Sequence, residues 1–454
     1  MSTPSHDWSD SAFFDMPDRA SLDGGTTSAG ALWHGISVRW GHSMHTMCSY
    51  HGMFPAKVAH YFIQRYSRPG DLVADPFSGR GTVALQARIE GRRTLSNDLN
   101  PLAYVLSKAK ASPPTWSNAV SLLERLESSY RVGGHAKPDV PDDIRMLYHP
   151  RTLPQISYLR EYLLRNKITD WSREEVMLGG SLAGIMHGSF RRDGTSQYLS
   201  ISMPNTFSMS PAYVKKYIET NHLIAPEQDV FECLRDKLAR LYLDAADGPG
   251  GRVFMRDASS LLSSNTIKPE SVDLIVTSPP YLQVVNYGTA NWIRLWLLGL
   301  DEVSRDRGVG RRKLDAKLDH RHTYNSYRDF LLRTLTGIRR VLKRNGVAVL
   351  IIGDVADPGK VPVPLAARIW DDIGDLTGLN QLELIEDHLQ VQNKVSRIWG
   401  DTKGQATSRD CAIVLARNDG GPSSEFKVID WDEPYKEGGP DAAHTRLREM
   451  RFAS

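Results

Sequence analysis

The chain has few cysteines and no long apolar run, and both absences narrow the class of protein. Its three cysteines, Cys48, Cys233 and Cys411, are odd in number and widely separated, which argues against a disulfide framework and favours reduced thiols in the cytosol. No apolar stretch approaches the ~20 residues of a membrane-spanning helix. The N-terminus lacks a charged segment followed by an apolar core, so we expect neither a signal peptide nor a membrane partner.

A strong excess of one charge is also missing. The 454 residues carry a formal net charge of +3, which is compatible with a nucleic-acid partner but does not argue for one, because only clustered charge would. The length permits one large domain with an insertion, or two domains. Residues 1–30 are rich in Ser, Asp, Gly and Thr, and we expect a mobile tail there. The stretch 418–454 is rich in Gly, Pro and charge, and we expect it to be peripheral.

A glycine-rich turn between an apolar strand and a helix is the first candidate ligand site. The strand covers residues 72–75, and the helix begins after Gly81. A second strand, residues 93–97, ends at Asp98, in the position of the ribose-binding acid of Rossmann-type sites. No Lys-Ser/Thr pair follows the glycines, which excludes a P-loop, and the third glycine of a dinucleotide site is missing. A nucleoside cofactor without a pyrophosphate fits better, and its candidate ligands are Asp75, Pro76, Phe77, Ser78, Gly79, Gly81, Thr82 and Asp98.

Two consecutive prolines follow a later strand. Residues 271–277 form an apolar run typical of a buried parallel strand, and the sequence Ser-Pro-Pro-Tyr, residues 278–281, comes directly after it. Neither proline has an N–H to donate, so the strand must stop at Ser278. A hydroxyl, a free carbonyl and an aromatic ring therefore lie at the sheet edge where ligands bind in open α/β sheets. A proline-stiffened loop is the alternative, and it suits the other Ser-Pro-Pro, at 112–114, which follows no strand.

Two more stretches add candidate cofactor ligands. A strand at 252–258 contains Asp257, whose carboxylate is suited to accept a hydrogen bond from a purine amino group. Asp257 is equally suited to cap the helix that follows, and both roles can coexist through different atoms. Phe54 and Pro55 stand at the start of an amphipathic helix, residues 56–66.

A histidine-rich segment precedes that helix. His42, His45, Cys48 and His51 are spaced three apart and have side chains of the kinds that bind zinc. Their spacing matches none of the common paired-ligand zinc patterns. A polar wall that faces a cofactor or DNA is therefore favoured over a metal site, and we predict no metal.

Mostly helical patterns fill residues 116–250, which we interpret as an insertion into a domain formed by residues 31–115 and 251–417. Two polar stretches, one inside the insertion and one after the 287–300 aromatic helix, are rich in basic residues that could contact phosphates. Solvated charged loops are the alternative. The candidate nucleic-acid contacts are Arg191, Arg192, Arg305, Arg307, Arg311, Arg312 and Lys313.

The order of these motifs resembles that of the amino-methyltransferases of nucleic acids, a branch of the S-adenosylmethionine-dependent Rossmann-like family. The run 75–82 resembles their cofactor loop, 277–281 resembles their catalytic motif, and 54–55 resembles the segment that covers the methionine end of the cofactor. The resemblance covers most of the chain outside the tails and the insertion. It implies an α/β fold with a mostly parallel sheet, and it implies S-adenosyl-L-methionine as the cofactor. The apolar runs 382–389 and 411–415, which a polar loop separates, predict a terminal hairpin. The implied catalytic residues are Ser278, Pro279, Pro280 and Tyr281.

The residue types suit methyl transfer to an exocyclic amino group of a base. The lone pair of such a nitrogen is delocalised into the ring, and acceptors for both of its hydrogens, Ser278 Oγ and the Pro279 carbonyl, make the lone pair more available. The sulfonium methyl is already activated, so holding the two reactants in line supplies much of the catalysis. Tyr281 offers a ring on which a flipped base can stack. Methylation at C5 of cytosine would need a nucleophilic cysteine, and none follows a proline here.

Serine at the first motif position accompanies cytosine-N4 specificity in this family more often than adenine-N6 specificity. We therefore expect a site-specific DNA methyltransferase that modifies N4 of cytosine in double-stranded DNA with a flipped base, in a restriction-modification or defence context. A cognate restriction endonuclease is a candidate partner, and we expect a prokaryotic cytoplasmic, nucleoid-associated protein. Adenine-N6 methylation, RNA base methylation and a silent DNA-binding partner subunit stay open as alternatives. The insertion departs from the common family arrangement, so the basic segment 305–322 competes with it for target recognition.

Overall fold

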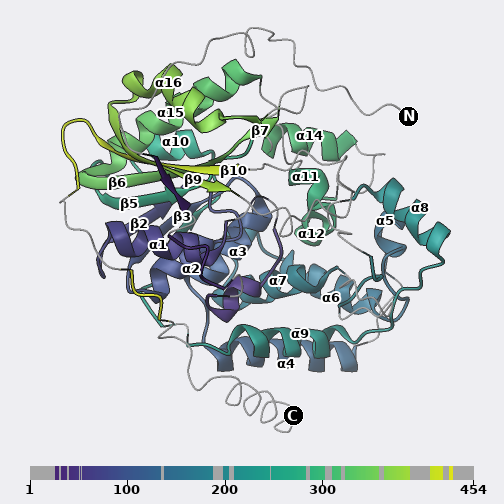
Figure 1. The fold of residues 1–454 in the computed structure, drawn as a ribbon. Coiled ribbons are helices and arrows are strands. Elements are labelled where there is room, and N and C mark those ends of the chain that lie inside the picture. Colours follow the sequence, from purple (N-terminus) through teal and green to yellow (C-terminus); the bar gives the residue numbers. More distant parts are fainter. Residues whose placement is uncertain are drawn as a thin grey trace.

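The structure is a computed structural model that describes residues 26–29, 32–37, 40–50, 52, 54–133, 138–187, 198–203, 209–245, 247–282, 287–301, 309–318, 323–356, 362–388, 409–422 and 429–432. These residues form an eight-stranded sheet in the order β1-β9-β10-β6-β5-β2-β3-β4 (Figure 1). Its strands are β1 (Thr26–Ser28), β2 (Leu72–Asp75), β3 (Arg93–Asn97), β4 (Arg252–Phe254), β5 (Val272–Thr277), β6 (Leu342–Gly353), β9 (Leu379–His388) and β10 (Arg409–Arg417). Strand β10 runs antiparallel to β6 and β9, and the other pairings are parallel. A separate small hairpin pairs β7 (Val355–Ala356) with β8 (Pro362–Val363).

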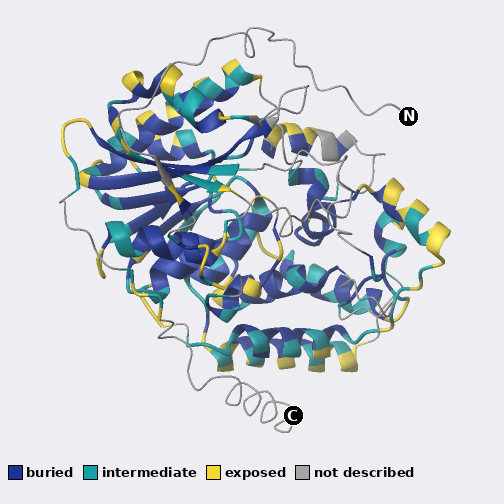
Figure 2. Ribbon diagram, in the orientation of Figure 1, coloured by how far each residue is buried: buried dark blue, intermediate teal, exposed yellow. Residues whose placement is uncertain are grey.

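Helices cover both faces of the sheet (Figure 1). On one face pack α1 (Ala56–Tyr66) and α2 (Thr82–Ile89), and on the other pack α10 (Ala258–Ser263), α15 (Tyr324–Val341) and α16 (Leu365–Thr377). Strand β6 shows why two layers form, because its side chains alternate between the faces. Val347, Val349 and Ile351 join the core beneath α1, whereas the intervening Ala348, Leu350 and Ile352 join the core beneath α15. Strands buried on both faces are typical of a parallel sheet between helical layers, and Figure 2 shows them buried.

A third core lies outside the sheet. It is built from helices between residues 116 and 250 together with helices on either side of that stretch in the chain, and it includes Leu106 of α3 and Trp296 of α12. The helices are α3 (Pro101–Ala111), α4 (Trp116–Val132), α5 (Asp142–Arg145), α6 (Leu153–Leu163), α7 (Arg173–Ile185), α8 (Pro211–Asn221), α9 (Val230–Leu241), α11 (Tyr287–Ala290), α12 (Trp292–Leu297) and α14 (Val309–Leu318). Two short 3-10 helices, η3 (Ser43–Thr46) and η4 (Ile168–Asp170), complete the described helices.

The α/β class, the mostly parallel sheet and the antiparallel terminal pair β9 and β10 agree with the sequence prediction. Three local expectations need correction. Thr26–Ser28, placed in the N-terminal tail, form the edge strand β1, and Asn291 divides the expected 287–300 helix into α11 and α12. The basic stretch after that helix was expected to be partly a loop, but Gly310 lies in the first turn of α14.

Candidate active site

The carboxyl ends of four neighbouring strands, β5, β2, β3 and β4, meet at one pocket, as expected for a ligand site in an open α/β sheet. The pocket brings together parts of the glycine loop, the acid after β3 and the proline motif after β5. Seven of the predicted site residues line it, namely Pro76, Phe77, Gly79, Asp98, Asp257, Ser278 and Pro280. The other lining residues are Tyr50, Gly52, Asn97, Leu99, Asn100, Arg256, Ala258, Tyr287 and Leu318.

The glycine loop is packed tightly against α3. Gly81 precedes α2 with a φ of 76°, in the left-handed region, and a Cβ there would lie 2.7 Å from the Cα of Ser107. Ser78 Oγ accepts a hydrogen bond from Ser107 Oγ at 2.9 Å, and the Ser78 N–H donates to the Asn97 carbonyl at 2.9 Å. The loop is therefore held in one shape before any ligand is bound.

Asp98 joins that loop to the end of β3. Its carboxylate accepts hydrogen bonds from the Gly79 N–H and the Asn100 N–H, each at 2.9 Å. Burial is the main influence on this carboxyl and raises its pKa to about 6, against the effect of the backbone donors. Because each carboxylate oxygen has two acceptor positions, Asp98 keeps capacity for a ligand hydroxyl at the pocket wall.

Asp75 lies behind the pocket wall. It is 2% exposed, and its Oδ1 accepts hydrogen bonds from Thr277 Oγ1 at 2.6 Å and from the Phe77 N–H at 3.1 Å. Burial raises its pKa to about 7. The predicted cofactor loop and the last residue before the proline motif are thus joined directly by one side chain.

Asp257 has one of its two predicted roles in the structure. Its Oδ1 accepts the Ser260 N–H at 2.8 Å and caps α10, while the residue also lines the pocket. The neighbouring Asn97 was not predicted from the sequence, although it is fully buried and ties three strand ends together. Its Nδ2 donates to the carbonyls of Pro76 and Arg256, and its Oδ1 accepts the Arg256 N–H.

The proline motif contributes Ser278 and Pro280 to the lining of the pocket. Ser278 Oγ is buried and makes no hydrogen bond of good geometry with the described residues, although it lies close enough to Tyr281 to influence the pKa of that phenol. Burial, the main cause, raises the pKa of Tyr281, whose hydroxyl donates to Asp410 Oδ1 at 3.4 Å. The Pro280 carbonyl accepts a hydrogen bond from Tyr327 Oη at 2.9 Å. Ser278 and Pro280 line the pocket, whereas Pro279 and Tyr281 lie just outside its lining.

The remaining predicted cofactor residues support the site from outside its lining. Phe54 packs against the core beneath α1, and Pro55 precedes the first turn of that helix. Thr82 is buried and its Oγ1 accepts a hydrogen bond from Arg80 Nε at 3.3 Å. Their roles toward a cofactor stay predictions.

The described histidines of the histidine-rich segment are engaged by other residues of the chain. His42 Nδ1 accepts the Met44 N–H, and His45 Nε2 lies 3.1 Å from Gln86 Oε1. Among the described residues, no three His, Cys, Asp or Glu side chains are grouped closely enough to hold a metal ion. His51 falls outside that part of the chain. The segment does reach the pocket, through Tyr50 and Gly52.

The predicted nucleic-acid contacts are mostly outside the described structure. Neither Arg191 and Arg192 nor Arg305 and Arg307 are described, and of Arg311 and Arg312 only the helical backbone is. Lys313 is exposed on α14, the helix whose Leu318 lines the pocket. None of the described helices is long and apolar enough to cross a membrane.

The sheet order, the glycine loop and the motif at the end of β5 define a Rossmann-like α/β fold of the methyltransferase type. Residues 21–108 match the model of the N6_N4_Mtase family, described as DNA methylase. Over 280 residues the chain is 24% identical to the type II methyltransferase M.MvaI of Kocuria varians, covering 57% of this chain and 58% of that protein. It is 18% identical over 311 residues to the type II methyltransferase M.BsoBI of Geobacillus stearothermophilus, covering 63% and 59%. The chain is thus similar to DNA amino-methyltransferases of the N4/N6 type, through the family match at residues 21–108 and through these two type II enzymes.

The matched regions span less than two thirds of the length of these relatives. Among solved structures, the DNA modification methylase TTHA0409 of Thermus thermophilus, complexed with S-adenosyl-L-methionine, matches 37% of this chain and 54% of its own, with 21% identity and a TM-score of 0.23. The rRNA methyltransferase aviRa of Streptomyces viridochromogenes matches 82% and 90%, with 12% identity and a TM-score of 0.27.

Proposed function

We propose that this protein transfers a methyl group from S-adenosyl-L-methionine to the exocyclic N4 amino group of cytosine in double-stranded DNA. One observation carries the proposal: residues of the glycine loop, Asp98 and Ser278 line a single pocket. A donor bound over the loop would lie beside the motif that receives the base. The match of residues 21–108 to the DNA methylase family and the similarity to type II methyltransferases support DNA as the polymer.

The donor side of the pocket has the groups that a nucleoside needs. We assign Asp98 to the ribose, and its remaining acceptor capacity beyond the bonds to Gly79 and Asn100 supports this role. Asp257 lines the same wall and can accept from an adenine amino group through the oxygen that does not cap α10. When bound, the donor supplies an activated sulfonium methyl, so the protein has to orient the reactants and exclude water.

The proline motif forms the side of the pocket that we propose receives the base. The Pro280 carbonyl is engaged by Tyr327, which leaves Ser278 Oγ and the Pro279 carbonyl as the two acceptors proposed for the amino hydrogens. These acceptors favour a more tetrahedral nitrogen with an available lone pair. The amino proton becomes acidic as the methyl group arrives, so a strong base is unnecessary. Tyr281, fixed near Asp410, offers a ring for stacking of a flipped cytosine.

The polymer would approach over the insertion and α14. We retain the division into a catalytic domain, 31–115 with 251–417, and a helical insertion, 116–250, as a proposal, and we assign target recognition to the insertion. Leu318 of α14 lines the pocket, and we assign the exposed Lys313 and Lys317 of the same helix to phosphates near the flipped nucleotide.

Methylation of duplex DNA in the presence of labelled S-adenosylmethionine, followed by digestion to nucleosides, tests the proposal. We expect label in N4-methylcytosine, and Ser278→Ala should lower turnover at least about tenfold, ~1.4 kcal/mol, with donor affinity little changed. Label in N6-methyladenine would leave the enzyme class standing and overturn the base assignment. Label only in RNA, or donor binding without transfer to any polymer, would overturn the DNA assignment or the catalytic one.

A further inference from the structure

Segment 45–50 runs between the glycine loop and the insertion and is held by cations from three parts of the chain. Arg80 Nη1 donates to the His45 carbonyl at 3.2 Å, and Lys237 Nζ donates to the Thr46 carbonyl at 2.9 Å. Arg294 donates to both the carbonyl and the hydroxyl of Ser49, at 2.7 and 2.9 Å. Three backbone carbonyls within five residues are therefore each bound to a positively charged side chain.

Two of the cations that bind segment 45–50 are buried, so their hydrogen bonds to its carbonyls contribute to stability. Lys237 is 4% exposed and Arg294 is 1% exposed. Burial lowers the pKa of Lys237 to about 8 and also lowers the pKa of Arg294. A buried cation costs free energy unless it is hydrogen-bonded, so losing these carbonyls would leave charges poorly solvated. The cations thus fix the backbone path of segment 45–50.

Helix α7 restricts the same segment from the other side. A Cβ on Gly184 would lie 2.0 Å from the Met47 carbonyl oxygen, and one on Gly180 would lie 3.0 Å from Met47 Sδ. Only a helix surface without side chains at these positions allows the backbone of the segment to approach so closely. The segment is therefore held by packing as well as by hydrogen bonds.

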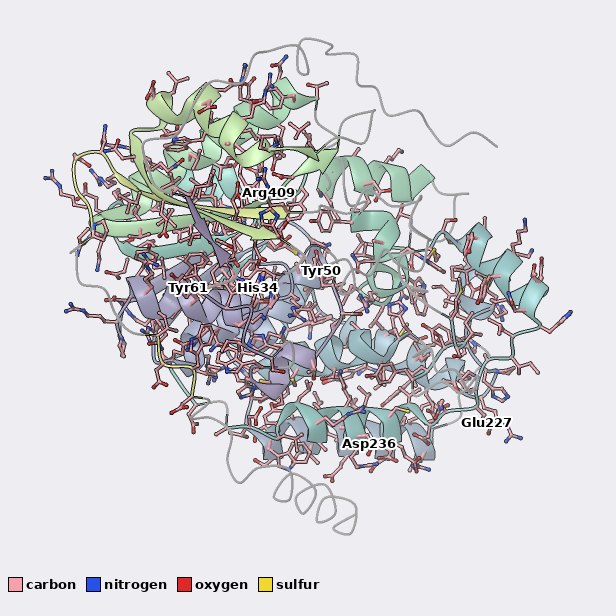
Figure 3. The ribbon with its side chains drawn as sticks, in the orientation of Figure 1. His34, Tyr50, Tyr61, Glu227, Asp236 and Arg409 are labelled. Atoms are coloured by element: carbon pink, nitrogen blue, oxygen red, sulfur yellow. The ribbon has the colours of Figure 1, made fainter. Side chains whose placement is uncertain are left out.

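Tyr50, at the end of the segment, is placed over the glycine loop. It is 6% exposed, and its ring lies above Gly79, where a Cβ would be 3.6 Å from Tyr50 Cε1. Its Oη accepts a hydrogen bond from Asn100 Nδ2 at 3.0 Å, and its ring stacks near Tyr287, with centroids 6.1 Å apart. All four residues line the pocket, and Figure 3 shows Tyr50 between the sheet and the helices of the insertion.

We propose that Tyr50 is a binding residue for the methyl donor, forming the wall opposite Gly79, and that Arg294 is the positioning residue that holds it there. The inference rests on the proposed function, because the ligand over Gly79 is taken to be the donor. Asn100 fixes the orientation of the Tyr50 ring, since its own Oδ1 is engaged by the Leu102 N–H at the start of α3. The wall is thus in place before the donor arrives, which reduces the ordering cost of binding.

Calorimetric titration of the full chain with S-adenosylmethionine and with S-adenosylhomocysteine, without DNA, tests the role of Tyr50. Tyr50→Phe should weaken binding of both ligands about threefold through loss of the Asn100 hydrogen bond, and Tyr50→Leu about tenfold or more through loss of the aromatic wall. KM for the donor should rise in parallel, while kcat at saturating donor changes less than about twofold. Tyr242→Phe is the control. It removes a hydroxyl that donates to the Pro114 carbonyl and does not line the pocket, so both affinities should stay unchanged.

The positioning role of Arg294 is tested by substituting it in proteins with and without the Tyr50 ring and measuring donor binding. Arg294→Met should weaken donor binding about tenfold, and Arg294→Lys should restore part of that loss by keeping a donor for the Ser49 carbonyl. In the Tyr50→Leu background, Arg294→Met should cause little further loss. If Arg294→Met does not fold, Ser49→Ala, at an exposed residue, removes only the hydroxyl bond and should weaken binding about twofold to threefold.

The outcomes separate this inference from the proposed function. Wild-type protein that binds the donor with an affinity unaffected by Tyr50→Leu would overturn the inference and leave the proposed function intact. Fully additive losses in the Tyr50→Leu/Arg294→Met protein would remove Arg294 as a positioning residue. Wild-type protein that binds neither ligand would overturn the proposed function, and the inference with it.

Discussion

One buried carboxyl group, that of Asp75, joins the two motifs on which the site depends. Its Oδ1 accepts hydrogen bonds from Thr277, the last residue of β5, and from Phe77 in the glycine loop. The loop and the proline motif, about 200 residues apart in the chain, are therefore kept in register by a single side chain. The same burial that makes this contact strong raises the pKa of Asp75 to about 7.

This pKa predicts a pH-dependent stability. The folded protein keeps the Asp75 proton up to about pH 7, whereas the unfolded chain loses it near its ordinary value of 3.8. Protonated Asp75 thus stabilises the folded protein fully below about pH 3.8, and this stabilisation is lost as the pH rises toward 7. Asp75→Asn keeps the acceptor Oδ1 and removes the titration. Relative to wild type, its free energy of unfolding should rise by roughly 2–4 kcal/mol between pH 4 and 7.

Urea unfolding at several pH values measures this difference. Asp71→Asn, in the turn before β2, is the matched control, since that carboxylate also accepts a backbone N–H, from Arg68. A dependence of comparable size, confined to about pH 4–6, should remain in Asp75→Asn because burial also raises the pKa of Asp98, to about 6. Parallel pH curves for wild type and Asp75→Asn would show that Asp75 is not protonated in the folded protein.

At the scale of elements, the glycine loop depends on the close approach of α2 and α3. Gly81 has a left-handed backbone and touches the backbone of Ser107, so a side chain there meets both strain and a steric clash. Gly70, in the turn before β2, has a φ of 90° but open space around its Cβ position. Substitution of either glycine causes backbone strain, but only substitution of Gly81 also causes a steric clash. Comparing the two therefore separates the free-energy cost of strain from that of packing.

Gly81→Ala should therefore destabilise the protein more than Gly70→Ala. We expect about 1–2 kcal/mol for Gly70→Ala from backbone strain, and about 1–3 kcal/mol more for Gly81→Ala from the clash with Ser107. Urea unfolding gives both values, and donor titration should show weaker binding for Gly81→Ala alone. Equal destabilisation by the two substitutions would mean that the loop relaxes away from α3 without cost.

At the scale of the molecule, two exposed basic helices are the candidates for the proposed contact with DNA. Helix α8 of the insertion has exposed Lys215 and Lys216, and α14, at the pocket, has exposed Lys313 and Lys317. Figure 1 shows α8 at the periphery of the insertion and α14 closer to the sheet. Phosphates next to a flipped nucleotide should therefore be contacted from α14.

Charge reversal of each pair measures the contact. Lys313→Glu/Lys317→Glu should weaken DNA binding and reduce the slope of log K against log salt concentration by about 1–2, because fewer counterions are released. Lys215→Glu/Lys216→Glu is the matched pair, and we expect a smaller change in that slope. A larger effect from the α8 pair would make the insertion the principal phosphate contact, and no effect from either pair would exclude both helices from the bound surface.

Much of the fold was predictable because its signals are local. The strand before Asp75, the glycine turn and the stop at Ser278 follow from apolar runs, from the conformational freedom of glycine and from the missing N–H of proline. The segments whose secondary structure was predicted wrongly are those that depend on contacts with residues far away in the chain. Strand β1 exists because it pairs with β9, more than 350 residues away, and α14 forms despite two nearby glycines, with its Leu314 and Leu318 packed in the insertion core.

The sequence by itself determined which residue types are available for the chemistry: the glycine loop, the acid after β3 and the Ser-Pro-Pro-Tyr motif. Each is a short pattern whose physical effect is complete within a few residues. Only the tertiary structure decided which other side chains reach the pocket. Tyr50, Asn97 and Asn100 have no motif of their own, and their positions depend on hydrogen bonds to residues 50 to 159 positions away. A linear pattern does not encode such contacts, because they exist only after the cores have packed.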